Sequence, residues 1–145
     1  MASVQVVKIL NVSSGAESGF LAVKDKDNFY GFNIQSGLLR AQKNVAGQIS
    51  YLALGTYNIQ TQKYLRLRHN QSTNIIFWEI SADGLNWSSL YQETPAFVLN
   101  TIHFELVAGT YKSETSPGTS IFDNFNILNQ GGGGIQYTQT KHGAF

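Results

Sequence analysis

The sequence predicts an all-β fold, a two-sheet antiparallel β-sandwich or jelly roll with an extended C-terminal arm. Short runs of residues alternate between apolar and polar, which is the pattern of half-buried strands. Turn-forming Gly, Asn, Asp and Ser residues separate these runs. No segment keeps apolar residues at helical spacing over three turns, so no helix is predicted. Many short strands at this spacing are typical of sandwiches.

The predicted strands follow one another in chain order with little chain between them. The alternating runs cover Val4–Leu10, Gly19–Lys24, Phe29–Gln35, Leu38–Asn44, Gln48–Ala53, Lys63–Asn70, Asn74–Ser81, Ile102–Gly109 and Ile121–Leu128. The predicted turns between them include Asp25–Asn28, Ser36-Gly37, Asn70–Thr73, Asp83–Asn86 and Thr115–Gly118.

The 145 residues fit one domain, and the composition changes near the C-terminus at Gly131–Gly134. We therefore divide the chain into a sandwich, residues 1–129, and a Gly-rich linker and arm, residues 130–145. Ile135–Thr140 is a short alternating run that favours a strand. Two interpretations stay open: a frayed terminus, or an assembly arm that adds to a sheet edge of a neighbouring subunit through Ile135, Tyr137 and Phe145.

Charge and composition exclude several classes of function. Only 13% of the residues are charged, against about 25% in typical proteins, and the net charge is +1 with scattered Lys and Arg. No surface for nucleic acid is therefore expected. No run approaches the roughly 18 apolar residues of a membrane span, so membrane insertion is not expected. The absence of cysteine excludes disulfides, thiolate metal sites and Cys nucleophiles.

Two stretches carry a resemblance to a known superfamily. Tyr64–Asn70 followed by Ile75–Trp87 resembles the "LRIRR…FYYSTDGxNW" hairpin of concanavalin A-like lectin/glucanase domains, of the laminin G-like jelly-roll kind. Gly19–Phe32 and the closing Phe122–Phe125 agree with it. The resemblance covers roughly residues 19–128 and implies the fold. It leaves the function open, because the superfamily holds lectins, glycosidases, adhesins and viral structural domains.

Strand alternation predicts one polar and aromatic sheet face. Leu65, Leu67, Ile76, Trp78 and Phe104 take the inward positions of their strands. The opposite positions hold Tyr64, Arg66, Arg68, Phe77, Glu79, His103 and Glu105. We expect these residues to lie together as a ligand-binding or partner-binding face, the alternative being an ordinary solvated sheet face.

Catalytic chemistry is not expected. Glycosidases use two carboxylates about 5–10 Å apart, and the glucanases that this hairpin resembles carry them in a Glu-x-Asp-x-x-Glu pattern. Here Glu79 is followed by Ile80 and Ser81, so the second carboxylate is missing, and Glu79 is predicted to pair with Arg66 or Arg68 on the adjacent strand. Three histidines are present, but no Gly-x-Ser-x-Gly elbow accompanies them. We interpret the chain as a non-enzyme.

No cofactor is expected, with calcium as the alternative. Asp25, Asp27 and Asn28 offer alternating oxygens, but Phe29 stands where a further ligand is required, so a polar hairpin turn explains them. Asp123 beside Asn124 is a second oxygen pair, which a lectin-like calcium site or neighbouring backbone N–H groups would satisfy.

These observations favour a non-catalytic structural or adhesive module of a larger assembly, with other protein subunits, itself included, as partners. A phage virion component, in capsid decoration or as a tail or receptor-binding accessory, is the expected setting. The N-terminus lacks a Sec signal, so synthesis in the cytoplasm and work in a virion or other extracellular assembly are expected. The alternative is a stand-alone carbohydrate-binding module or lectin, which would bind a cell-surface glycan through Tyr57, Trp87 and Tyr91, with Trp87 also interpretable as packing.

Overall fold

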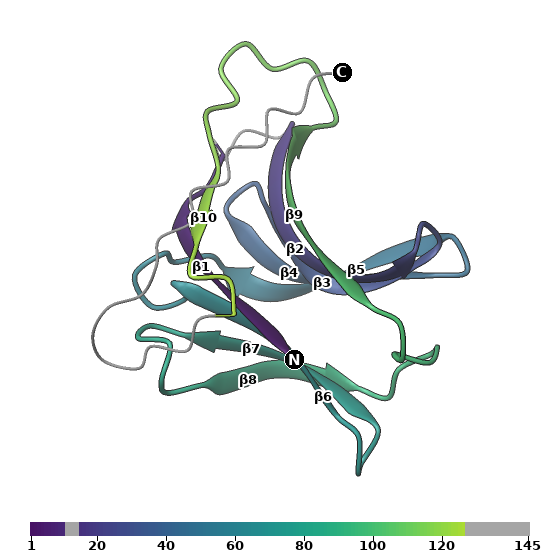
Figure 1. The fold of residues 1–145 in the computed structure, drawn as a ribbon. Coiled ribbons are helices and arrows are strands. Elements are labelled where there is room, and N and C mark those ends of the chain that lie inside the picture. The colour runs from purple at the N-terminus through teal and green to yellow at the C-terminus, as the bar shows by residue number, and fades with distance from the viewer. Residues whose placement is uncertain (11–14, 127–145) are drawn as a thin grey trace.

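The computed structural model describes residues 1–10 and 15–126, and these residues form strands and no helix (Figure 1). The strands are β1 (Ala2–Lys8), β2 (Ala16–Asp25), β3 (Asn28–Gln35), β4 (Leu38–Val45), β5 (Gln48–Thr56), β6 (Tyr64–Asn70), β7 (Ile75–Ser81), β8 (Ser88–Glu93), β9 (His103–Thr110) and β10 (Ile121–Asp123). Within these ranges, no helix is long and apolar enough to cross a membrane.

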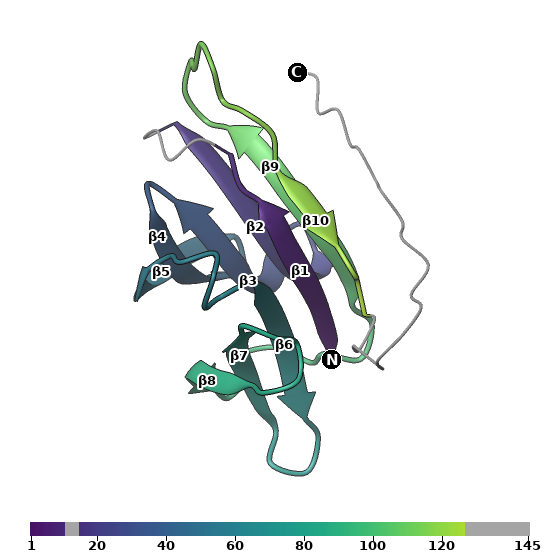
Figure 2. The same ribbon diagram turned by 90° about the vertical axis from the view of Figure 1, so that its left-hand side faces the viewer.

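The strands form two antiparallel five-stranded sheets, so the predicted all-β sandwich is confirmed for the described residues. Sheet A has the order β10-β1-β6-β7-β8, and sheet B has the order β5-β4-β3-β2-β9. The two sheets face each other, with β10 beside β1 and β9 beside β2 (Figures 1 and 2). In this arrangement β5, β8, β9 and β10 are the edge strands.

Tight two-residue turns connect the hairpins of sheet B. Ser36 and Gly37 join β3 to β4 with φ of 52° and 74°, and Ala46 and Gly47 join β4 to β5 with φ of 51° and 82°. Two successive positive φ values match the twist of antiparallel strands, and glycine adopts them without a Cβ clash. These turns fix the register of β3, β4 and β5 relative to one another.

The core lies between the two sheets and consists of the inward side chains of both. Sheet A contributes Val4, Leu65 and Trp78, all fully buried, and sheet B contributes Phe20 and Phe32. The Trp78 indole N–H donates a hydrogen bond of 2.7 Å to the Gly31 carbonyl oxygen of the opposite sheet. The predicted inward positions of Leu65, Leu67, Ile76 and Trp78 are therefore confirmed.

Two elements differ strongly from the expected ones, while the bounds of the other predicted strands shift by no more than about three residues at either end. Strand β8 was not predicted, because Ser88–Glu93 has little alternation and lies half-exposed at a sheet edge. The strand expected over Ile121–Leu128 ends at Asp123, because Asn124 and Asn126 turn the chain with φ of 49° and 55°. The expected domain boundary at 129 and the arm lie outside the described residues.

Candidate interaction surfaces

The outer face of β6 and β7 brings together five of the residues that the alternation placed on one face. In the β6–β7 pairing, Tyr64 lies opposite Ser81, Arg66 opposite Glu79, and Arg68 opposite Phe77. Directly paired residues share a sheet face, and residues two apart along a strand share it as well. We call Arg66, Arg68, Phe77, Glu79 and the nearby Trp87 the outer-face cluster.

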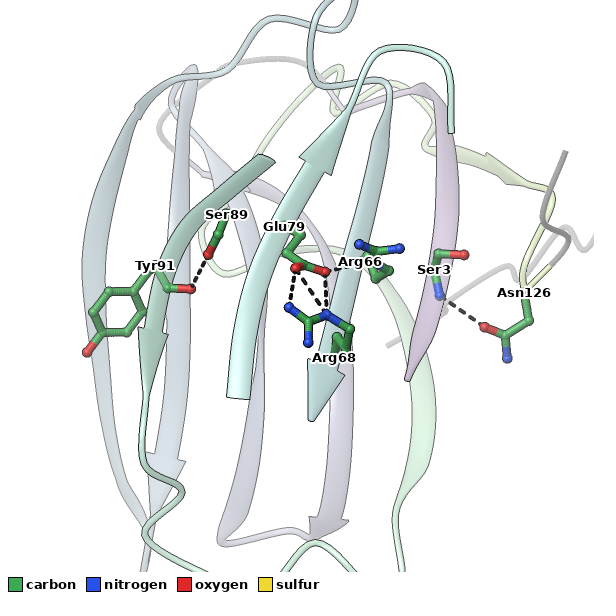
Figure 3. A network of polar contacts seen from close by, with 7 residues as sticks. All are labelled: Ser3, Arg66, Arg68, Glu79, Ser89, Tyr91 and Asn126. Carbon is green, nitrogen blue, oxygen red and sulfur yellow. Dashed lines mark hydrogen bonds and ion pairs between the residues drawn. The ribbon is translucent and has the colours of Figure 1, made fainter. Parts of the chain in front are cut away.

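Glu79 is the centre of this cluster (Figure 3). Its carboxylate accepts a hydrogen bond of 2.6 Å from Nε of Arg66 and one of 2.7 Å from an Nη of Arg68. The Glu79 side chain is 6% exposed, while the Arg66 and Arg68 side chains are 14% and 31% exposed. The predicted ion pairing of Glu79 with the adjacent strand is thus confirmed, and it involves both arginines.

The two guanidinium groups hold Glu79 in its ionised form. Burial by itself would raise the pKa of Glu79, but the hydrogen bonds from Arg68 and Arg66 outweigh burial and keep that pKa below its ordinary value. The hydrogen bond that Arg68 donates to Glu79 also raises the pKa of Arg68. A carboxylate in this state is a poor proton donor, and the three groups together keep one positive charge.

Aromatic rings complete the cluster. The Arg66 guanidinium carbon lies 4.0 Å from the centre of the Trp87 ring, and that of Arg68 lies 4.0 Å from the centre of the Phe77 ring. Cation–π stacking at this distance is favourable and restricts the long arginine side chains. The outer-face cluster is therefore an ordered surface of stacked planar groups.

The loop between β7 and β8 positions Trp87. The Asp83 carboxylate accepts hydrogen bonds of 2.8 Å from the backbone N–H groups of Leu85 and Asn86 and from the Asn86 amide. These contacts, the backbone N–H of Asn86 above all, hold the pKa of Asp83 well below its usual range. Gly84 has a φ of 76°, which closes the loop. The hydrogen bonds of the Asp83 side chain thus hold the loop backbone in one conformation and place Trp87, the residue after Asn86, over Arg66.

His103 and Glu105 do not belong to the outer-face cluster, so the expectation of one shared face is wrong for these two residues. They lie on β9, which pairs with β2 in sheet B. The His103 ring nitrogen lies 2.9 Å from the Glu105 carboxylate, and both side chains are about half-exposed. Alternation predicts which side of a strand a residue occupies, but it contains no information about which sheet the strand joins.

The aromatic residues of the alternative sugar platform are placed on different surfaces. Trp87 lies on the outer side of sheet A, stacked on Arg66. Tyr91 faces inward, with its ring 5.2 Å from that of Trp78 and its hydroxyl donating to Glu93. Tyr57 is half-buried, burial raises its pKa, and its hydroxyl has no hydrogen-bond partner among the described residues. Ile135, Tyr137 and Phe145 of the expected arm lie outside the described residues.

An open groove between β5 and β8 was not predicted. It has a volume of about 200 Å³ and is lined from both sheets. The lining residues are Ala41, Gln42, Lys43, Ser50, Tyr51, Leu52, Trp78 and Tyr91. An ion pair of 2.7 Å between Lys43 and Glu93 crosses from one sheet to the other. The sequence did contain one signal for it, the run Gln48–Thr56 without charged residues. That run can be recognised as an edge strand only when the strand order is known.

A second, shallower depression lies beside the β6–β7 hairpin. It has a volume of about 360 Å³ and is lined by His69, Gln71, Asn74 and residues 95–100. A ring nitrogen of His69 lies 3.0 Å from the Asn74 amide oxygen, and Val98 is 66% exposed. Amide side chains beside apolar surface are able to bind a hydroxylated ligand.

The two candidate calcium positions are occupied by internal hydrogen bonds. Asp25 accepts from the Asp27 backbone N–H and the Asn28 amide, each at 2.9 Å. Asp123 accepts a bond of 2.8 Å from the backbone N–H of Asn124. In residues 1–10 and 15–126, no group of three or more His, Asp or Glu side chains is arranged to hold a metal ion.

Comparison with protein-family models, with curated proteins and with solved structures finds no match for this chain.

Proposed function

We propose that this chain is a non-catalytic structural or adhesive module of a larger protein assembly. The observation that carries the proposal is β5, an edge strand without charged residues whose Ile49, Tyr51 and Leu52 side chains are 53%, 49% and 46% exposed. Natural sheets usually protect a long edge with charge, proline or a covering segment, because an unprotected edge pairs with other chains. The uncharged and exposed edge of β5 is therefore able to pair with a strand of another protein chain.

The assembly that we propose is a phage virion, with this chain in capsid decoration or as a tail or receptor-binding accessory. The proposal includes a jelly-roll topology of the concanavalin A-like kind and docking through the C-terminal arm. A surface with few charges supports it, because uncharged polar side chains form subunit contacts without the desolvation of ions.

The state of Glu79 supports a non-catalytic role. A glycosidase acid must carry a proton near neutral pH, whereas two arginines keep Glu79 ionised. Its same-face neighbours on β7 are Phe77 and Ser81, so no second carboxylate stands beside it on that strand. The arrangement stabilises a surface and has no proton to give.

The proposed function predicts self-association or association with other subunits of the particle. Light scattering on the full chain over a wide concentration range should give discrete oligomers whose mass rises with concentration. A glycan titration should show no saturable binding. A chain that stays monomeric at every concentration and binds a glycan in a saturable manner would contradict the proposal.

A carbohydrate-binding role is the second candidate, and the depression beside His69 favours it. Gln71, Asn74 and Asn100 provide amide donors and acceptors next to the exposed Val98. Sugar sites combine such polar groups with apolar surface. If this function is right, Gln71→Ala should weaken glycan binding several-fold in a titration. Gln60→Ala changes another exposed glutamine in a different loop and should leave binding unchanged.

A further inference from the structure

Strand β5 is the least protected sheet edge among the described residues. It is nine residues long and contains no Asp, Glu, Lys, Arg or Pro, and every residue except Leu54 is exposed. The other edges are shorter or charged: β10 has three residues, β8 has six and ends at Glu93, and β9 carries His103 and Glu105. The geometry points to β5 as the edge that another strand joins.

The inward side of β5 is incompletely covered. Leu52 lies opposite the buried Ala41 of β4, so its side chain points between the sheets, yet it is 46% exposed. It lines the groove together with Trp78 and Tyr91 of sheet A. On this side of the molecule sheet A ends at β8, whose Glu93 pairs with Lys43 of β4, so no further strand of sheet A covers the inward side of β5. A further strand beyond β5 would close this groove with its inward side chains.

The sequence outside the described residues contains a segment that fits this edge. Ile135–Thr140 alternates apolar and polar residues, carries no charge and follows Gly131–Gly134. With Ile135 and Tyr137 on the inward side, the polar Gln136 and Thr138 fall on the outward side. A segment without charge suits an edge without charge, because no charged group has to leave water when the two strands pair.

The position of the last described residue favours a second copy as the source of the strand that joins β5. The described chain ends at Asn126 beside β1 of sheet A, where the Asn126 backbone N–H donates a hydrogen bond of 2.8 Å to the Ser3 carbonyl oxygen. The ring of the preceding Phe125 packs on Phe20 of β2 with ring centres 6.2 Å apart. A strand beyond β5 would lie four strand spacings from β2, which is about 19 Å across the sheet. A chain that crosses to its own β5 must also pass around a complete sheet, whereas the outward edge of β5 lies open to a neighbour.

We propose that Ile135–Thr140 of one copy pairs with the free edge of β5 in a second copy, with Ile135 and Tyr137 over Leu52 in the groove. Backbone hydrogen bonds along β5 give affinity, and the groove side chains give register. This inference rests on the proposed assembly function, because it names the partner and the place of contact.

A mixing experiment with two full-length variants tests the inference. Leu52→Lys places a charge on the accepting edge and keeps the arm intact. The double variant Ile135→Asp/Tyr137→Asp spoils the arm and keeps the edge intact. Each variant alone should be monomeric by light scattering, with the dissociation constant raised at least about tenfold. An equal mixture should associate again, because one partner supplies the arm and the other the edge.

The control is Leu85→Lys, which makes the same change at a loop residue that is 62% exposed and does not line the groove. It should keep the oligomer of the unaltered chain. The fluorescence of the buried Trp78 reports whether each variant is folded.

Each other outcome overturns the inference in a recognisable way. Oligomers of unchanged mass in both variants would place the contact elsewhere and leave the assembly function standing. If Leu52→Lys abolishes association but the arm variant still associates, β5 pairs with β5 of the second copy and the arm is not the partner. A monomeric unaltered chain whose arm variant unfolds at lower temperature would indicate that the arm docks on its own copy. Failure of the mixture to associate would also exclude exchange between copies.

Discussion

At the scale of single residues, Glu79 is the group whose charge most affects stability. Its carboxylate is nearly inaccessible and accepts hydrogen bonds from two arginines, each of which stacks on an aromatic ring. Removing one member of such a buried set leaves the remaining charges without compensation. The arginines keep some contact with solvent, which moderates the cost.

We therefore expect Glu79→Gln to lower the free energy of unfolding by about 2 kcal/mol at pH 7. The pKa of Glu79 is depressed in the folded state, so its contribution is complete above its unfolded pKa of about 4.3 and disappears as pH falls through the folded value. Urea unfolding at pH 7 and pH 3 should show the difference between the two proteins shrinking in acid.

Glu105→Gln is the matched control for that prediction. Glu105 is half-exposed beside His103, so its replacement should change the free energy of unfolding little at neutral pH. An equal deficit of Glu79→Gln at pH 3 and pH 7 would mean that packing, and not charge, explains the loss.

At the scale of elements, the close approach of β2 and β3 depends on Gly31. A Cβ at this position would lie 2.6 Å from the Phe20 carbonyl oxygen and 2.3 Å from a methyl group of Leu21. The backbone oxygen cannot move without disturbing the β2–β3 ladder. Gly31 thus allows two central strands of sheet B to keep their register.

Gly31→Ala should cost more than about 2 kcal/mol of unfolding free energy, because overpacking against backbone cannot relax cheaply. Gly109→Ala is the control, since nothing lies within 4 Å of a Cβ there and the residue is also in a strand. Thermal unfolding of both variants measures the difference. If the two variants unfold at similar temperatures, β2 and β3 can move apart enough to accommodate a Cβ at position 31, and the prediction is wrong.

At the scale of the whole molecule, Trp78 joins the two sheets. Its ring is fully buried, lies edge-on to Tyr30 with ring centres 5.7 Å apart, and donates its N–H to Gly31 across the core. A buried carbonyl that loses its donor costs about 1–3 kcal/mol. This single side chain therefore contributes both packing and a directed bond between the layers.

Trp78→Phe should lower the free energy of unfolding by roughly 3 kcal/mol, since it removes the N–H and leaves a cavity. The same substitution at Trp87, which is half-buried on the outer side over Arg66, should cost less than half as much. Chemical denaturation of the two variants compares them directly. Equal losses would mean that the bond between the sheets contributes little.

The sequence by itself determined most of the strands, their inward residues and the pairing of Glu79 with Arg66 and Arg68. These features depend on the two-residue period of the strand and on hairpin neighbours, which are local properties. Only the tertiary structure decided that β8 pairs at the edge of sheet A, that β9 with His103 and Glu105 belongs to sheet B, and that a groove opens beside β5. Strand order and edge exposure result from the packing of segments that are distant in sequence, so they cannot be predicted from the alternation within one segment.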